Sequence, residues 1–509
     1  MGFSSLLGEP STSPVPTDGA GRFPAPFADL GLDRLVAAVS REDPEIVPLF
    51  HAPASSPAAA RYRQDLCRAL RGDPRLTGRL RRFCATMAEM REARANAARL
   101  TLRPESDAWA LHAARRYLAA IAGLRSALAE TVAPATALRD LREHLDRLAG
   151  SPGHRALEGD AAAAAELLDR VEYTVRIKNS DVRVGRYHGE PDYGAEVAAV
   201  FDRFRVDEGG RRAEEPPVRP GLDGIDAAIL DHVTALFPEA FRALARFRTE
   251  HAEDRDPVPA QVDLEIRWYL AYLDFVAAME AAGLPFTLPT IAERPILHVQ
   301  NTFDVAMAMD LARRGERVVG NDLLLGDDER VLVLTGPNHG GKTALARAFG
   351  QVHHLAALGL PIPGTDAEIG LFDALYTRFE RPESADDRLG RLEEDIEGMR
   401  GILTTATDRS VVVMNETFSS TSLEDGIRLG TAVVRRLLET GSRCVYVTFV
   451  DEIATIGPGV VSMTADVPDD PSERTYRVRR GPPRGLAHAD ALARRHGLDP
   501  ATLSRRIAS

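Results

Sequence analysis

The segment Val331-Leu-Val-Leu-Thr-Gly-Pro-Asn-His-Gly-Gly-Lys-Thr343 decides the fold of this chain. Its four leading apolar residues predict a buried strand, and the residues that follow, 344–358, are typical of a helix. Between them lies the pattern G-x-x-x-x-G-K-[ST], whose glycines let the backbone turn its N–H groups toward phosphates. The segment therefore predicts a P-loop that binds a nucleoside triphosphate in an α/β domain.

We expect the whole loop to contact the nucleotide. Lys342 would neutralise the β- and γ-phosphates, and the Thr343 hydroxyl would bind Mg²⁺. Lys342 is one of only two lysines in the chain, the other being Lys178. The residues predicted to surround the phosphates are Gly336, Pro337, Asn338, His339, Gly340, Gly341, Lys342 and Thr343.

A second segment, Val411-Val-Val-Met-Asn-Glu416, has the form of a Walker B strand. Four apolar residues end in a polar pair, at the strand edge where ligands of α/β sheets bind. Glu416 is the predicted catalytic residue, because it would orient or deprotonate the attacking water. Asn415 occupies a position that is usually an Asp. That Asp usually holds Mg²⁺ through a water molecule. The amide of Asn415 brings no negative charge, so we expect weakened Mg²⁺ binding and slow hydrolysis.

The chain changes character near residue 290. Pro285, Pro289 and Pro295 mark a boundary, after which short apolar strands alternate with helices, as at Val445–Thr448. We therefore expect an α/β ATPase domain over residues 291–509 with a largely parallel sheet.

The first half is predicted to be helical, after a flexible leader at 1–22. Apolar residues recur at helical spacing from Asp29 to about Ala149, and the pattern returns at about Ala195 and again over 223–282. A loop at 207–221 interrupts it. The runs Glu172–Lys178 and Val182–Val184 flank an Asn-Ser pair and predict a small hairpin.

Composition restricts the class of protein. The 509 residues are 44% hydrophobic, include three scattered cysteines, and hold no apolar run long enough to cross a membrane. We expect a soluble, cytoplasmic protein. A net charge of −12 argues against indiscriminate coating of nucleic acid, although residues 61–100 hold eleven arginines against four acids, an excess of seven. That excess indicates either phosphate contacts or a solvated helix face.

These motifs resemble those of the MutS family. Thr335–Thr343 is similar to that family's TGPNMGGKS, with His339 in place of Met, and Glu416–Gly426 parallels DEIGRGTSTYDG. Residues 481–498 resemble the stretch that closes the family's ATPase domain. Further matches follow in order and approximate spacing: Gly359, Pro361, Pro363, Glu368-Ile-Gly370, Asp373 and Thr377-Arg378.

The resemblance implies a multidomain fold. A helical core and lever region over 23–290, with a small β-containing clamp-like insert at about 135–220, would precede a P-loop ATPase domain of the ABC/MutS type. Segment 61–64 resembles the family's lever entry. We expect no N-terminal mismatch-reading domain of the kind that full-length members carry.

The resemblance also implies a homodimer joined through the ATPase domains. A helix beginning near Gly390 and Arg391 would then contact the γ-phosphate of the other subunit; the alternative for Arg391 is an ordinary surface position. The family's histidine after the next strand is Phe449 here. The segment Val318–Asn321 lacks the aromatic residue that stacks on adenine, so we expect a less defined base pocket.

The implied function is that of an ATP-dependent DNA-binding protein. It would be an ATP-gated dimeric clamp on duplex, mismatched or branched DNA, with ATP and Mg²⁺ as cofactors and no membrane partner. Lys178, Arg183 and Arg186, near the hairpin, are candidate DNA contacts or else ordinary surface charge. The alternative is a non-hydrolysing ATP-binding switch that acts through protein partners.

Overall fold

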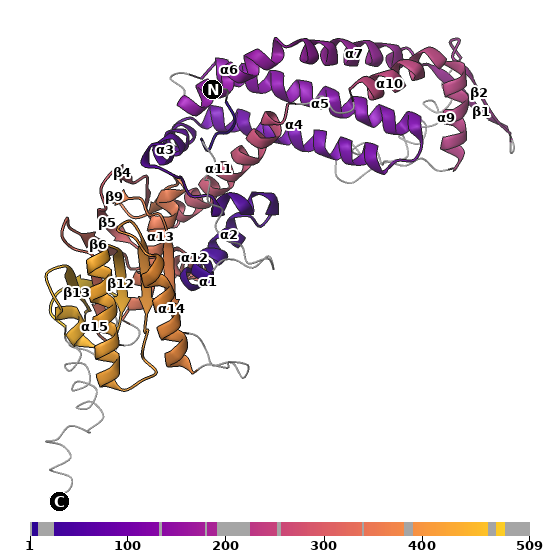
Figure 1. The fold of residues 1–509 in the computed structure, drawn as a ribbon. Coiled ribbons are helices and arrows are strands. Elements are labelled where there is room, and N and C mark those ends of the chain that lie inside the picture. The colour runs from indigo at the N-terminus through magenta and orange to yellow at the C-terminus, as the bar shows by residue number, and fades with distance from the viewer. Residues whose placement is uncertain are drawn as a thin grey trace, which may run out of the picture. The chain divides into compact units, whose positions relative to one another are not determined.

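A computed structural model describes residues 3–8, 25–131, 135–178, 181–190, 224–251, 256–337, 340–380, 390–466 and 475–483. The chain divides into two compact units (Figure 1). Unit 1 comprises residues 1–2, 78–132 and 140–263, and unit 2 comprises 3–77, 133–139 and 264–509. Within the described residues, no helix has the length and apolarity needed to span a bilayer. The predicted helix at Ala195 and the predicted loop at 207–221 lie outside the described residues.

Unit 1 is built from long helices. They are α5 (Arg103–Ala129), α7 (Pro152–Asp169), α9 (Gly224–Leu236), α10 (Pro238–Glu250), most of α4 (Pro74–Arg99) and of α6 (Thr136–Ala149), and the start of α11 (Val258–Ala281). The helical spacing expected in α5 is confirmed, because Tyr117, Ile121 and Leu124 are all buried. Ser151 caps α7 by accepting a hydrogen bond from the His154 N–H at 3.2 Å.

The hairpin predicted in this region is also confirmed. Strands β1 (Tyr173–Lys178) and β2 (Asp181–Arg186) pair antiparallel, with Arg176 opposite Arg183 and Lys178 opposite Asp181. Because side chains alternate along a strand, Arg176, Lys178 and Arg183 share one face. The other face carries apolar residues, of which Ile177 is 71% exposed.

The centre of unit 2 is a six-stranded sheet in the order β10-β11-β12-β7-β13-β14. The strands are β7 (Val331–Thr335), β10 (Leu375–Phe379), β11 (Val411–Asn415), β12 (Arg443–Val447), β13 (Val460–Ala465) and β14 (Val478–Arg480). All pairings are parallel except that of β13 with β14. Every residue of β7, β11 and β12 is buried, as expected for strands covered on both faces.

Helices cover both faces of this sheet. Helix α13 (Lys342–Ala357) packs on β11 and β12. On the opposite face, Val412 and Met414 of β11 share a core with Met399 of α14 (Arg391–Thr405) and Val434 of α15 (Leu423–Thr440). Alternation along β11 therefore places Asn415, like Val413, on the face of α13.

A second sheet, in the order β4-β9-β5-β6, completes unit 2. Its strands are β4 (Thr290–Ala292), β5 (Leu297–Thr302), β6 (Asn321–Leu325) and β9 (Asp366–Gly370), and β3 (Phe286–Thr287) pairs separately with β8 (Ile362–Pro363). The remaining elements are α1 (Ala25–Leu30), α2 (Leu32–Val39), η1 (Pro44–His51), α3 (Pro57–Gly72), α12 (Val305–Arg313) and η2 (Asp451–Thr455).

Candidate functional site

The glycine-rich loop between β7 and α13 has a backbone that only glycine fits well. Gly336 and Gly341 have φ values of 114° and 88°, in the region that L side chains rarely adopt. A Cβ at Gly340 would lie 2.8 Å from the Cβ of Ala465, and one at Gly341 would lie 3.2 Å from the carbonyl oxygen of Tyr476. The loop therefore packs tightly against the β13–β14 segment. Asn338 and His339, predicted to contact phosphate, lie outside the described residues.

Lys342 is the first residue of α13 and points back into the loop. Its Nζ donates hydrogen bonds to the carbonyl oxygens of Gly336 and Pro337, both at 2.7 Å, and the residue is only 4% exposed. The ring of Phe449 lies 4.9 Å from this ammonium, at the position that sequence comparison gives to a histidine. Burial lowers the pKa of Lys342, and the nearby Glu416 acts in the opposite direction.

The end of β11 places two polar residues beside this loop. Asn415 is 9% exposed, and among the described residues its Oδ1 has no hydrogen-bond partner. At Glu416 the backbone turns into the left-handed region, with φ 57°, while its N–H donates to the carbonyl oxygen of Val447 at 2.9 Å. Glu416 lines the same cavity as Lys342 and Thr343. The structure thus brings together the predicted catalytic and metal-binding residues.

The pKa of the Glu416 carboxyl is raised above its ordinary value. Burial is the largest cause and the neighbouring Glu380 is the second, while Lys342 opposes both. The Glu380 carboxyl therefore lies near that of Glu416 at this edge of the sheet. Sequence reasoning missed Glu380, which no motif marks.

A cavity of about 580 Å³ extends from the loop toward α12 and β6. Besides the loop it is lined by Met307, Leu311, Glu316, Arg317, Val319, Asn321 and Tyr476. The aromatic residue among those lining this cavity is Tyr476, which comes from a distant part of the chain. Asn321 fixes that segment, because its Nδ2 donates to the Tyr476 carbonyl at 3.1 Å and its Oδ1 accepts from the Val478 N–H at 2.8 Å.

Helix α14 begins at the residues predicted to reach a second nucleotide. Gly390 is its N-cap, without a side-chain hydrogen bond, and Arg391 is its first residue. A guanidinium nitrogen of Arg391 lies 3.5 Å from Glu380 Oε1. Arg378 of β10 holds Asp395 of the same helix at 2.8 Å. The start of α14 is therefore tied to the edge of the sheet that carries Asn415 and Glu416.

The arginine-rich stretch 61–100 is largely engaged within the protein. Arg63, one of the eleven arginines in this stretch, is 1% exposed and donates to two backbone carbonyls. Arg71 pairs with Glu280, and Arg91 pairs with the buried Asp263. Neither of the two interpretations of this stretch, phosphate contacts or a solvated helix face, holds for the buried Arg63, and Arg71 and Arg91 form ion pairs within the protein.

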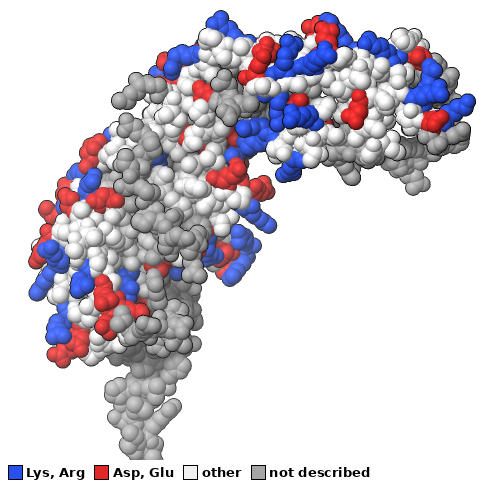
Figure 2. Space-filling model, turned by 45° about the vertical axis from the view of Figure 1, so that its right-hand side comes forward, with Lys and Arg blue, Asp and Glu red and all other residues white. Residues whose placement is uncertain are grey.

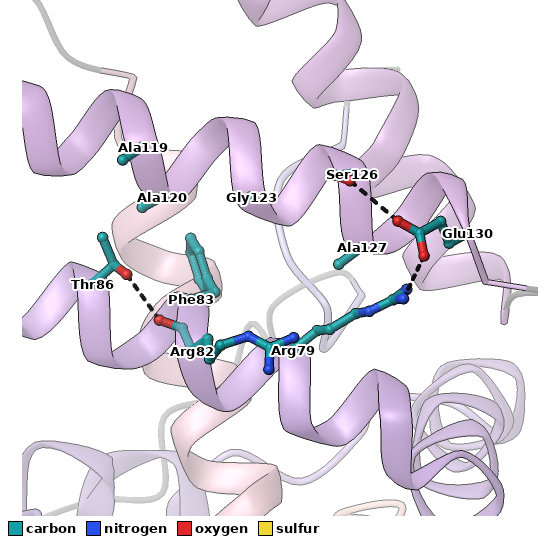
Figure 3. A pocket seen from close by; sticks show the side chains of 10 residues that line it. All are labelled: Arg79, Arg82, Phe83, Thr86, Ala119, Ala120, Gly123, Ser126, Ala127 and Glu130. Atoms are coloured by element: carbon teal, nitrogen blue, oxygen red, sulfur yellow. Dashed lines mark hydrogen bonds and ion pairs between the residues drawn. The ribbon is translucent and has the colours of Figure 1, made fainter.

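A pocket of about 450 Å³ in unit 1 is lined by two more arginines of this stretch, one of which is also paired within the protein (Figure 3). Arg79 of α4 points to Glu130 at the end of α5 and pairs with it, and Ser126 also bonds Glu130 at 3.3 Å. Arg82 lines the pocket beside Phe83. The ion pair between Arg79 and Glu130 thus links α4 to the end of α5 beside this pocket.

The three candidate DNA contacts do not all lie on the same face of the hairpin. Lys178 and Arg183 lie on its basic face, whereas Arg186 lies on the other face. Arg186 donates to the Leu236 carbonyl at 2.6 Å and stacks over the ring of Phe237 at 4.8 Å. Figure 2 shows basic side chains gathered along unit 1, with acidic ones between them.

Comparison with known proteins agrees with the sequence motifs. Residues 332–476 match the family model described as MutS domain V. The Endonuclease MutS2 of Gemmatimonas aurantiaca is 32% identical over 199 residues, which cover 38% of this chain and 24% of that protein. The Endonuclease MutS2 of Geobacillus thermodenitrificans is 28% identical over 273 residues, which cover 52% of this chain and 33% of that protein. The matched regions thus span at most a third of these relatives.

Proposed function

Because this chain belongs to the MutS family, we propose that it is an ATP-dependent DNA-binding protein in which ATP binding near the glycine-rich loop controls the grip on DNA. The observation that carries the proposal is the single cavity lined by Gly341, Lys342, Thr343, Glu416 and Tyr476. It combines in one cavity groups that suit phosphate binding, acid–base chemistry and stacking on a base.

The residues present also fit Mg²⁺. The unpartnered Oδ1 of Asn415 and the hydroxyl of Thr343 are oxygen donors of the kind that Mg²⁺ prefers, directly or through water. When bound, the ion would neutralise charge between the phosphates. Lys342 would hold the phosphates, and Glu416 would orient the attacking water and accept its proton.

Tyr476 is expected to stack on the nucleobase. Replacing Tyr476 with Ala should weaken ATP binding about tenfold, since base–aromatic stacking contributes about 1–3 kcal/mol. Tyr476→Phe should remain within twofold of the original protein. Titration with a fluorescent ATP analogue measures the effect, and inorganic triphosphate, which has no base, is the control ligand. An equal loss of triphosphate binding would show instead that Tyr476 only supports the loop against which it packs.

The proposed clamp contacts DNA through the basic face of the β1–β2 hairpin. Arg176 and Arg183 lie directly opposite each other, a like-charge pair that costs stability unless an anion lies nearby. Arg176 is paired with Glu190 at 3.1 Å, which leaves Lys178 and Arg183 as the candidate phosphate contacts.

The double substitution Lys178→Gln with Arg183→Gln should weaken duplex DNA binding about tenfold at low salt. It should also reduce the slope of log affinity against log salt by roughly 2, because two phosphate contacts are lost. Fluorescence anisotropy over a range of salt concentrations measures both quantities. Arg170→Gln, at another exposed position of unit 1, is the control. The hairpin assignment is wrong if the control and the double variant behave alike.

Dimerisation through the ATPase domains belongs to the same proposal. Helix α14 begins at Gly390 and Arg391, and the positive end of its dipole suits a phosphate of a facing subunit. Sedimentation with and without ATP tests this, since an ATP-dependent dimer is the expected result.

The second candidate is an ATP-binding switch that does not hydrolyse. It is favoured by the neutral Asn415 and by Phe449 over the Lys342 ammonium. ATP turnover measured with duplex, mismatched and branched DNA separates the two. DNA-stimulated turnover supports the clamp, whereas Lys342-dependent ATP binding that no DNA affects supports the switch.

A further inference from the structure

A second pocket of unit 1, of about 330 Å³, is lined mainly by the start of α5 and by α10. These two helices pack against each other (Figure 1). Three of the lining residues are arginines, Arg103 from α5 and Arg242 and Arg248 from α10. Asp107 is the one carboxylate among the lining residues. Three positive charges against one negative charge indicate that the pocket attracts an anion.

The three arginines are not used equally within the protein. Arg248 donates hydrogen bonds to the carbonyl and hydroxyl oxygens of Ser106, both at 3.0 Å, and lies 3.9 Å from Asp107. Arg103 and Arg242 are exposed, and within the described residues no hydrogen bond or ion pair engages either guanidinium group. Two of the three guanidinium groups are thus available to a ligand.

A phosphate group is the anion that this arrangement suits best. A guanidinium group presents a planar fork of N–H donors that matches two phosphate oxygens, and two available groups line this one pocket. The first turn of α5 lines it as well, and its N-cap, Leu102, makes no side-chain hydrogen bond. The positive end of that helix dipole therefore adds to the attraction. The pocket of Figure 3 differs, because Glu130 there neutralises Arg79.

The pocket lies next to the β1–β2 hairpin. Helix α10 begins at Pro238, which lines the pocket, and the ring of the preceding Phe237 lies 4.8 Å from the guanidinium group of Arg186 in β2. Arg186 also donates to the Leu236 carbonyl oxygen at 2.6 Å. The pocket and the hairpin are thus adjoining parts of unit 1. A DNA strand, which repeats its phosphates at regular spacing, can contact both, whereas a single free phosphate cannot.

We propose that this arginine pocket, formed by Arg103, Arg242 and Arg248, holds a phosphate of a DNA strand that also contacts the basic face of the hairpin. The inference rests on the proposed DNA binding and adds a contact that no sequence motif marks. Arg103 and Arg242 bind the phosphate oxygens, and Arg248, held by Ser106, contributes a third positive charge.

The double substitution Arg103→Gln with Arg242→Gln tests the proposal. It should weaken duplex DNA binding about fivefold at low salt and reduce the slope of log affinity against log salt by about 1, because one phosphate contact is lost. Fluorescence anisotropy with a labelled duplex, over a range of salt concentrations, measures both quantities. The melting temperature should stay that of the original protein, since both arginines are exposed.

The matched control is Arg147→Gln with Arg155→Gln, which removes the same charge from exposed positions of unit 1. These positions lie where α6 ends and α7 begins, and nearby Asp146 pairs with Arg125, close to the far end of α5. The control should bind the duplex within twofold of the original protein and keep its salt slope. If the two double variants behave alike, the proposal is overturned while the hairpin contact stands.

Calorimetric titration with inorganic phosphate and with AMP separates the other source of a phosphate group. Binding of AMP that depends on Arg103 and Arg242, in a protein whose duplex affinity does not depend on them, would assign the pocket to a free phosphorylated ligand and overturn the proposal. Failure of the original protein to bind duplex DNA at any salt concentration would instead overturn the proposed function itself.

Discussion

Lys342→Met is expected to weaken ATP binding by at least about 100-fold, which corresponds to about 2.8 kcal/mol. The lysine is 4% exposed, and its Nζ reaches the carbonyl oxygens of Gly336 and Pro337 at 2.7 Å. An ammonium in this position lies where the loop would bring the β- and γ-phosphates. No other lysine is available nearby, since the chain contains only Lys178 besides. Titration with a fluorescent ATP analogue measures the loss.

The sequence provides a natural control for this experiment. Lys178→Met removes the remaining lysine, which lies on the hairpin of unit 1, and should leave ATP affinity within twofold. Met keeps the length and apolar stem of the buried lysine, so the fold should persist. A melting curve without nucleotide checks this. Tight ATP binding by a folded Lys342→Met protein would refute the phosphate-binding role.

Glu416→Gln is expected to lower ATP turnover by 100-fold or more while ATP binding is retained. Removing a positioned general base costs roughly 10²–10⁴ in rate. The amide keeps the shape of the side chain but cannot accept a proton. Turnover is measured under saturating ATP, and Glu424→Gln, in the exposed first turn of α15, is the control. Unchanged turnover in Glu416→Gln would assign the base to another residue.

The pH dependence of turnover should follow the Glu416 carboxyl. Its pKa is raised by burial first and by Glu380 second. Turnover should therefore fall as the pH drops through this raised pKa, since the base becomes protonated. Stability should change in the opposite direction. A carboxyl whose pKa is higher in the folded protein favours folding when protonated, so stability declines as the pH rises from the unfolded to the folded pKa. Glu416→Gln should remove both dependences.

The sequence predicted the structure best where the residues that form a feature are contiguous in the chain. Strand β7, the glycine-rich loop and α13 are contiguous. A strong apolar run also predicted β11, and two runs that flank an Asn-Ser pair predicted the β1–β2 hairpin. Tyr476 was missed because it reaches the cavity through tertiary packing, where Asn321, 155 residues away in the chain, holds its carbonyl. Glu380 was missed because only strand pairing brings it to Asn415.

Charge counting was the weakest guide. The arginines of 61–100 indicated either phosphate contacts or a solvated helix face, but Arg63 is buried against backbone carbonyls and Arg79 is paired with Glu130. A long side chain can satisfy partners far away in the sequence, and a count along the chain cannot distinguish this use from a solvent-facing charge. A count of charges also cannot distinguish Arg183 from Arg186. Only the strand register shows that they lie on opposite faces of the hairpin.

The central claim is that ATP binding at Lys342 controls DNA binding. The most direct test is the affinity for a duplex DNA, measured by anisotropy, with and without a non-hydrolysable ATP analogue. The account predicts that the analogue changes DNA affinity at least fivefold in the original protein and leaves the Lys342→Met protein unaffected, because coupling requires differential binding to two states. Equal DNA affinity with and without the analogue, in a protein that binds it, would contradict the account.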